Sequence, residues 1–189
     1  PRYPVPQHIC ELTYDLIQQG KLRFDKSQND DMVLTYHDSC NVARASRMGP
    51  TPGGQFEIPR AIIRSVCNHF YDMPANTIRE STFCCGSGSG LNAGEDMELR
   101  LTGGLPRANA VKYVHEKHGV NMLSTICAID RAALPALTEY WVPEVDVAGV
   151  HELVANALNL EGQNDRTLDL RGEDIPGLES DSEEETDEG

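Results

Sequence analysis

The sequence has few basic residues, few aromatic side chains and no long apolar run. Of 189 residues, 16 are Lys or Arg and 30 are Asp or Glu, so the formal net charge is -14, and 6% are aromatic. The sign of this charge disfavours nucleic-acid partners, which are bound through Lys and Arg. No apolar stretch approaches the roughly 20 residues that span a bilayer, and nothing resembles a signal peptide. The composition therefore predicts a globular domain of the cytoplasm.

Cysteine is too scarce for a disulfide framework. Six cysteines in a chain of this length favour a reducing compartment instead. We interpret Cys10 and Cys67 as small buried hydrophobes, because a lone cysteine usually has that role. The chain begins at Pro1 rather than at a methionine. We therefore expect it to be part of a longer polypeptide.

Positive charge is missing altogether from the last residues. Positions 172–189 hold nine acidic residues and no Lys or Arg, which leaves -5 (that is, -14 + 9) for positions 1–171. Positions 179–188 also have no apolar side chain, so we expect this segment to be disordered. It either solvates the protein or docks on a basic partner. The sequence thus predicts a domain over 1–160 and an acidic tail over 161–189.

The hydrophobic pattern predicts alternating helices and strands. Apolar periodicity indicates helices over 6–19, from 58 onward, over 95–118 with a break near 103–106, over 131–139 and over 150–158. Short apolar, β-rich runs predict strands over 32–36, 69–73 and 120–123. Positions 38–55 are expected to form a loop. This alternation favours a small α/β domain with a largely parallel sheet flanked by helices.

Four cysteines form the most informative pattern. Cys84 and Cys85 are adjacent, and a disulfide between neighbours would be strained. Their thiolates are soft ligands that suit iron-sulfur centres. Cys40 and Cys127 each follow a predicted strand, at the edge of an α/β sheet where ligands bind. The four thiols therefore predict a metal or iron-sulfur site.

The glycines after the cysteine pair support that prediction. Without a Cβ, Gly86 and Gly88 allow the backbone to approach an inorganic core and to point N-H groups at it. The same run weakly resembles a dinucleotide-binding loop. Leu91 stands where the third glycine of that fingerprint would be, so we do not favour nucleotide binding.

Several motifs together resemble a known family. They are His37-Asp38-Ser39-Cys40-Asn41-Val42-Ala43-Arg44, Pro59-Arg60, Cys84-Cys85-Gly86-Ser87-Gly88 and the strand that ends at Cys127. In this order they resemble the cysteine-rich CCG domain of heterodisulfide reductases and of iron-sulfur subunits of glycolate, lactate and glycerol-3-phosphate oxidising enzymes. The resemblance covers positions 7–141. The Cys-Ala-Ile-Asp ending resembles the catalytic subunit of a membrane complex associated with sulfite reduction.

The resemblance implies a cofactor, a reaction and partners. It implies a non-cubane 4Fe-4S cluster held by Cys40, Cys84, Cys85 and Cys127, at which a protein-bound disulfide or trisulfide is reduced. It also implies that the chain is the C-terminal part of a cytoplasmic enzyme subunit, peripheral to the membrane through a cytochrome b-type subunit and other subunits. A small protein that carries the disulfide or trisulfide would be the substrate.

One position departs from the family's pattern. The family closes with Cys-x-x-Cys, and Ser124 stands at the first of these positions. Ser124 is either a weak oxygen ligand or a residue just outside the ligand set, since a protonated hydroxyl binds metal poorly. His37, three residues before Cys40, is either a proton donor, since its unperturbed pKa is near neutrality, or a histidine hydrogen-bonded to Asp38. Arg44 and Arg60 either stabilise the cluster's charge or form ordinary salt bridges.

Two alternative functions stay open at this point. The cluster could relay electrons between a flavin subunit and a quinone, as in the glycolate and glycerol-3-phosphate enzymes. The thiols could instead bind zinc in an interaction module, although structural zinc sites usually use tight Cys-x-x-Cys pairs, which are missing here.

Overall fold

The computed structural model describes residues 6–88 and 96–159. Four strands form a single sheet in the order β2-β1-β3-β4, and every pair is parallel. The strands are β1 (Val33–Tyr36), β2 (His69–Phe70), β3 (Met122–Thr125) and β4 (Asp146–Gly149). The predicted α/β fold with a parallel sheet is therefore confirmed. The predicted acidic tail lies outside the described residues.

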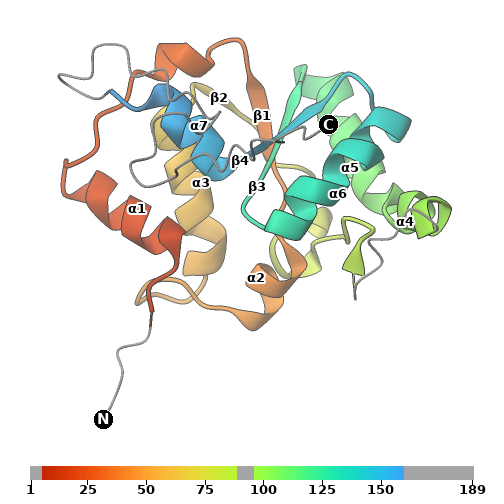
Figure 1. The fold of residues 1–189 in the computed structure, drawn as a ribbon, viewed down its shortest axis with the longest axis horizontal. Coiled ribbons are helices and arrows are strands. Elements are labelled where there is room, and N and C mark those ends of the chain that lie inside the picture. Colours follow the sequence, from red (N-terminus) through yellow and green to blue (C-terminus); the bar gives the residue numbers. More distant parts are fainter. Residues whose placement is uncertain (1–5, 89–95, 160–189) are drawn as a thin grey trace, which may run out of the picture. The chain divides into compact units, whose positions relative to one another are not determined.

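Helices cover both faces of the sheet (Figure 1). The helices are α1 (Ile9–Gln18), α2 (Cys40–Ala45), α3 (Gly54–Val66), α4 (Met97–Gly103), α5 (Leu105–His118), α6 (Ala128–Trp141) and α7 (Val150–Ala157), with short 3-10 turns at Lys26–Asn29, Ala75–Thr77 and Arg79–Ser81. Helices α1, α3 and α7 pack on one face and α5 and α6 on the other. Helix α2 begins just after β1 and α6 just after β3. The segments that carry Cys40 and Cys127 therefore start from the middle of the sheet.

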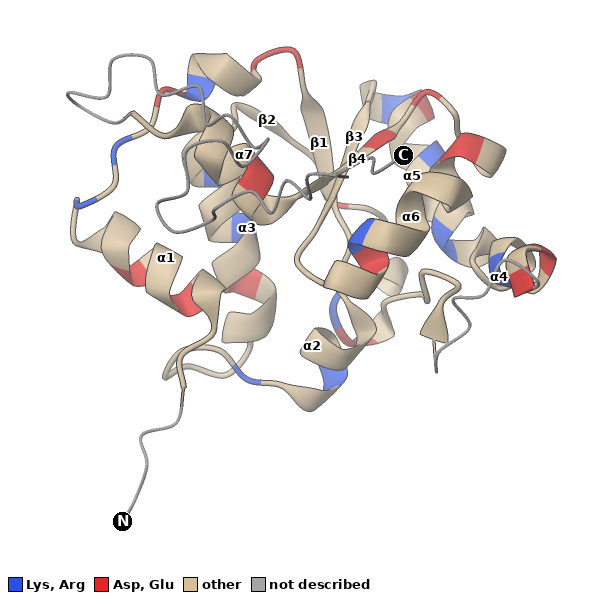
Figure 2. Ribbon diagram, in the orientation of Figure 1, with Lys and Arg blue, Asp and Glu red and all other residues tan. Residues whose placement is uncertain are grey.

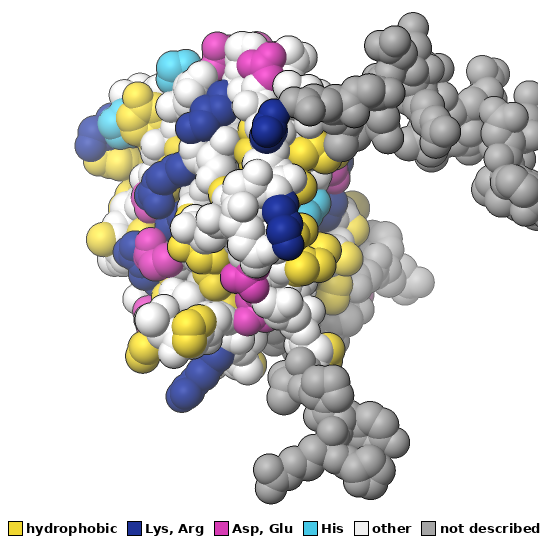
Figure 3. Space-filling view, turned by 90° about the vertical axis from the view of Figure 1, so that its left-hand side faces the viewer, with side chains coloured by type: hydrophobic (Ala, Val, Ile, Leu, Met, Phe, Trp, Pro, Cys, Tyr) yellow, Lys and Arg dark blue, Asp and Glu magenta, His cyan; other side chains and the backbone are white. Residues whose placement is uncertain are grey.

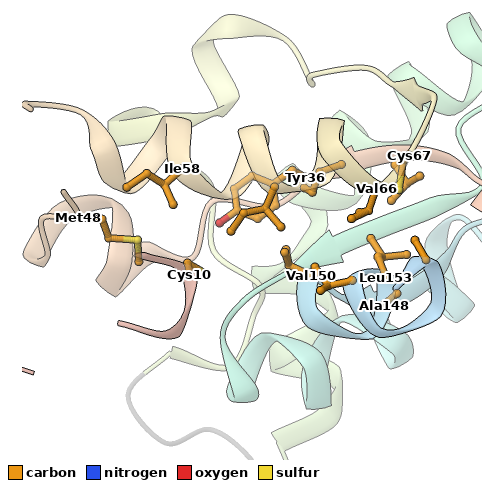
Figure 4. Packing of buried hydrophobic residues seen from close by; sticks show 14 residues of the cluster. Cys10, Tyr36, Met48, Ile58, Val66, Cys67, Ala148, Val150 and Leu153 are labelled. Atoms are coloured by element: carbon orange, nitrogen blue, oxygen red, sulfur yellow. The ribbon is translucent and has the colours of Figure 1, made fainter. Parts of the chain in front are cut away.

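Alternation along the strands divides the apolar residues into two cores. Leu34 and Tyr36 on β1 point to the α1, α3 and α7 side, whereas Val33 packs on the α5 and α6 side. Figure 4 shows Cys10 and Cys67 at opposite ends of the first core. They are 0% and 3% exposed, and burial is the main cause that raises the pKa of Cys10 to about 12 and of Cys67 to about 11. Their interpretation as buried hydrophobes is confirmed.

The predicted loop over 38–55 was wrong in part. Residues Cys40–Ala45 form α2, and α3 begins at Gly54 rather than at 58. Gly53 takes the left-handed region with φ of 85°, which lets the chain turn directly into the helix. The pair Gly53-Gly54 thus starts a helix, although consecutive glycines usually indicate a loop.

Strand β4 was not predicted, and the sequence gives little signal for it. Asp146-Val147-Ala148-Gly149 has one β-branched residue among poor strand formers. Its pairing with β3, in register from Met122↔Asp146 to Thr125↔Gly149, provides the stabilisation that propensity lacks. Pairing with β3, rather than local propensity, therefore makes this segment a strand.

The charges of the described part are mixed. Acidic and basic positions are interspersed over the helices (Figure 2), and the face seen in Figure 3 carries apolar side chains scattered among charged ones. Among the described residues, no helix is long and apolar enough to cross a membrane.

Candidate metal centre

Two of the four candidate thiols lie at the same edge of the sheet. Strands β1 and β3 are parallel neighbours, with Tyr36 opposite Ser124, so their carboxyl ends meet there. Cys40 opens α2 beyond β1, and Cys127 is the N-cap of α6 beyond β3. Both side chains are partly exposed. Strands β1 and β3 therefore place two thiols at the edge of the sheet at which α/β proteins bind ligands.

The cysteine pair occupies a loop with unequal exposure. Cys84 is exposed, whereas Cys85 is 6% exposed and belongs to the core on the α5 and α6 side. Burial raises the pKa of the Cys85 thiol, and contact with the carboxylate of Asp130 raises it further. Asp130 lies in the first turn of α6, three residues after Cys127. This contact connects the loop of the cysteine pair with the helix that Cys127 caps.

Gly86 and Gly88 have different roles beside this pair. Gly86 has φ of +93°, and a Cβ there would lie 2.3 Å from the carbonyl oxygen of Arg100 on α4. Its N-H donates to the Cys84 sulfur at 3.3 Å. A Cβ at Gly88 would lie 3.6 Å from that sulfur, which is an ordinary contact distance. Gly86 thus permits the turn, and Gly88 leaves space beside the exposed thiol.

We expect Gly86→Ala to distort this loop. Strain in the left-handed region alone costs about 1–3 kcal/mol, and the backbone clash with Arg100 adds to it. Gly103→Ala is a matched control, because a Cβ there meets nothing within 4 Å. Thermal unfolding and iron content of the two variants check this prediction. Equal melting temperatures for both would contradict it.

A buried polar group surrounds Asp130, whose carboxylate contacts the Cys85 thiol. His37 Nε2 is 3.4 Å from Asp130 Oδ2, and both residues are at most 2% exposed. Thr125 donates to the same Oδ2 at 3.2 Å, and Ser39 and Thr125 lie within hydrogen-bond distance of each other. Burial lowers the pKa of His37. Burial alone would raise the pKa of Asp130, but the nearby imidazole and the Cys85 thiol hold it well below its usual range.

Asp38 joins the two segments that lead to cysteines. Its carboxylate accepts from both terminal nitrogens of Arg60 at 2.7 Å and from the backbone N-H of Arg79 at 2.8 Å. Thr82, two residues before the cysteine pair, donates to the carbonyl of Asp38 at 2.7 Å. Arg79 has a positive φ of 55°, which is rare outside glycine. These bonds tie the loop before Cys84 to the loop before Cys40.

The two arginines named from the sequence therefore have other partners. Arg60 forms a core salt bridge with Asp38 and also contacts Asp72 at 2.8 Å. Arg44 donates to the backbone carbonyls of Glu80 and Thr82. Of the alternatives considered for Arg60, the structure supports the salt bridge.

Ser124 lies on the other side of the sheet from this polar group. It pairs in register with Tyr36 and Ala148, which face α1, α3 and α7. Its hydroxyl is buried without a hydrogen-bond partner among the described residues, and its carbonyl accepts from His37 N at 2.8 Å. A ligand role for Ser124 stays a prediction.

The donor chemistry fits a sulfur-ligated cofactor, although the side chains are not gathered into a ligand shell. In the described part of the chain, no three side chains of His, Cys, Asp or Glu lie close enough to hold a metal ion. The fit rests on thiols at one sheet edge and on glycines that leave the Cys84 sulfur approachable. The ligand set of Cys40, Cys84, Cys85 and Cys127 stays a prediction.

Sequence reasoning gave Asp130 no role in this region and did not predict the partners of Asp38. Asp130 carries a usable signal, since an acidic residue in the first turn after Cys127 marks a helix N-terminus. For Asp38, the sequence gives no indication that its partner is Arg60, 22 positions away.

Known proteins resemble this chain over most of its length. It is 47% identical over 172 residues to the Hdr-like menaquinol oxidoreductase iron-sulfur subunit 2 of Archaeoglobus fulgidus, which covers 89% of this chain and 30% of that protein. It is 31% identical over 156 residues to one subunit of the dihydromethanophenazine:CoB--CoM heterodisulfide reductase of Methanosarcina mazei, covering 82% of this chain and 34% of that protein.

A further similarity is shorter. The EtfAB:quinone oxidoreductase of Syntrophomonas wolfei is 29% identical over 83 residues, which is 44% of this chain and 10% of that protein. The chain thus spans about a third of the first two relatives. These relatives support a relationship to the heterodisulfide reductase family. No family model matches the sequence, and no solved structure matches the chain.

Proposed function

We propose that this chain is the cysteine-rich domain of a heterodisulfide reductase-like oxidoreductase. In this proposal Cys40, Cys84, Cys85 and Cys127 hold a 4Fe-4S cluster of the non-cubane type, and a disulfide or trisulfide on a small protein is reduced beside it. The observation that carries the proposal is the similarity to two Hdr-type subunits over more than four fifths of the chain, combined with thiols at one sheet edge.

The reaction needs two electrons and two protons for each disulfide, because two thiols are formed from one sulfur-sulfur bond. When bound, the cluster would supply the electrons one at a time. Exposed Cys84 and the space beside Gly88 leave an approach for a protein-borne sulfur.

His37 is the proposed proton donor. Burial favours its neutral form, so the imidazole acts as a relay that takes up a proton at one ring nitrogen and releases it from the other. Neither ring nitrogen has a hydrogen-bond partner within the described residues, and Nε2 faces Asp130. His37→Asn should keep the iron and slow disulfide reduction.

The proposed setting is a membrane-associated complex of dissimilatory sulfur metabolism. In it, the chain corresponds to DsrK, the catalytic subunit associated with sulfite reduction, and a cytochrome b-type subunit supplies electrons. The names of two relatives, a menaquinol oxidoreductase subunit and a dihydromethanophenazine reductase subunit, support electron transfer with membrane carriers.

Anaerobic purification with iron and sulfide analysis and EPR of the oxidised form tests the cofactor. Four irons and four sulfides per chain, with turnover of a small disulfide, are expected. A protein that is free of iron and holds one zinc would contradict the proposal and favour an interaction module.

A second candidate is an electron relay without disulfide chemistry. This candidate is favoured by the similarity to a quinone oxidoreductase, which extends over 83 residues, or 44% of the chain. A cluster that is reduced and reoxidised by a quinol and quinone pair, but gives no thiol from any disulfide, would identify the relay.

A further inference from the structure

Arg107 on α5 is a buried cation without a carboxylate in contact among the described residues. It is 0% exposed, and its donors reach Met73 Sδ at 2.8 Å, Thr77 O at 2.7 Å and Thr82 Oγ1 at 2.8 Å. Its Nε has no partner within the same part of the chain. Arg60, equally buried, has the carboxylate of Asp38 at 2.7 Å. Arg107 therefore lacks the direct anion that Arg60 has.

A buried guanidinium is expensive unless negative charge lies near it. Asp38, Asp130 and the thiol of Cys85 are the negative or ionisable groups that act on Arg107 through space. Burial lowers the pKa of Arg107 to about 10, so its side chain is still charged at neutral pH. The groups that act on Arg107 therefore include Cys85, a candidate ligand, and Asp130, which contacts it.

Arg107 contacts the two residues that precede the cysteine pair. Its guanidinium bonds to Thr82 and lies 5.9 Å from the ring centre of Phe83, the residue that precedes Cys84. Neither the side chain of Arg107 nor that of Thr82 reaches solvent appreciably. In such a poorly solvated position a charge acts strongly on its neighbours, because water does not screen it.

We infer that Arg107 is the charge-compensating residue of the proposed cluster, the fixed cation that favours its reduced form. The inference rests on the proposed function. Each electron that the cluster takes up from a reductant adds one negative charge to it. A buried cation beside the cysteine pair stabilises that added charge, so Arg107 makes the midpoint potential less negative.

The two arginines first considered from the sequence are less suited to this role. The charge of Arg60 is already balanced by Asp38 and Asp72, and Arg44 is exposed. Arg107 was not considered, because nothing in its sequence context separates it from the other polar positions of α5.

The test is a potentiometric EPR titration of the full chain reconstituted with iron and sulfide. Arg107→Gln should shift the midpoint potential to a more negative value, whereas Arg107→Lys, which keeps the charge, should stay close to the wild type. Arg131→Gln is the control. Arg131 lies four residues after Cys127, but it is 42% exposed and paired with Glu152, so its removal should leave the potential unchanged.

The outcomes separate this inference from the proposed function. A wild-type protein that takes up no iron would overturn both. A cluster with the same potential in Arg107→Gln as in the wild type would overturn the inference alone. Equal shifts in Arg107→Gln and Arg107→Lys would also overturn it, since they would indicate hydrogen bonding rather than charge.

If Arg107→Gln cannot be loaded with a cluster, its midpoint potential cannot be measured. The iron content of the two Arg107 variants then tests the inference. The apo-proteins of both variants are first compared by far-UV circular dichroism. A lysine variant that retains iron where the glutamine variant does not supports the inference. Equal iron loss in the two variants overturns it.

Discussion

Replacing Cys84 or Cys85 with serine should remove most of the iron from the reconstituted protein. A protonated hydroxyl is a poor metal ligand, so either substitution eliminates one of the proposed thiolate ligands. The two variants should differ in fold stability, because Cys85 is 6% exposed and Cys84 is exposed. Iron and sulfide analysis after anaerobic reconstitution provides the measurement.

Cys10→Ser and Cys67→Ser are the matched controls. Both thiols are buried in the core on the α1, α3 and α7 side of the sheet, whereas Cys85 belongs to the core on the other side. Their iron content should stay near that of the wild type. Each variant should nevertheless lose about 1–3 kcal/mol of stability, because a hydroxyl replaces a thiol in an apolar site. If Cys67→Ser lost as much iron as Cys84→Ser, the ligand assignment would be wrong.

Replacing Arg60 with methionine should lower the free energy of unfolding by about 3–5 kcal/mol, because it leaves a buried carboxylate without its cation. Arg60 and Asp38 are 0% and 2% exposed, and their two bonds are 2.7 Å long. After the substitution, Asp38 retains the backbone N-H of Arg79. Urea denaturation of the apo-protein measures the change.

A double variant separates the ion pair from general damage to the core. Arg60→Met combined with Asp38→Leu should lose less stability than the sum of the single variants, since no unpaired charge stays buried. Glu57→Gln is the surface control. Its bridge to Arg79 joins two side chains that are 41% and 55% exposed, and such pairs contribute about 0–1 kcal/mol. An Arg60→Met effect as small as that of Glu57→Gln would refute the prediction.

Local patterns predicted the elements that carry strong periodicity. The helix over 6–19, the strand over 32–36 and the helix break near 103–106 correspond to α1, β1 and the junction of α4 with α5. Each has an apolar repeat or a glycine and proline signal within a few residues. The segments that escaped prediction, α2 and β4, are short, and β4 depends on its pairing with β3.

The candidate site could also be predicted only in part. The thiols and glycines could be named from the sequence, because their chemistry and their adjacency are visible in it. The bond from Asp38 to Arg60 and the position of Arg107 behind Thr82 depend on how α3 and α5 pack. Two aspartates and three arginines near the site look alike in the sequence, and only the packing assigns each a partner.

The pairing of β1 with β3 also sets the order of events during synthesis. Val33 donates to the side chain of Asn121, 88 positions later, and parallel pairing of this kind closes a long loop before any contact stabilises it. Cys40 therefore leaves the ribosome long before the strand that places Cys127 at the same sheet edge. Folding of this domain should be slow, and the proposed cluster should assemble only after position 127 has emerged and the central strands have joined.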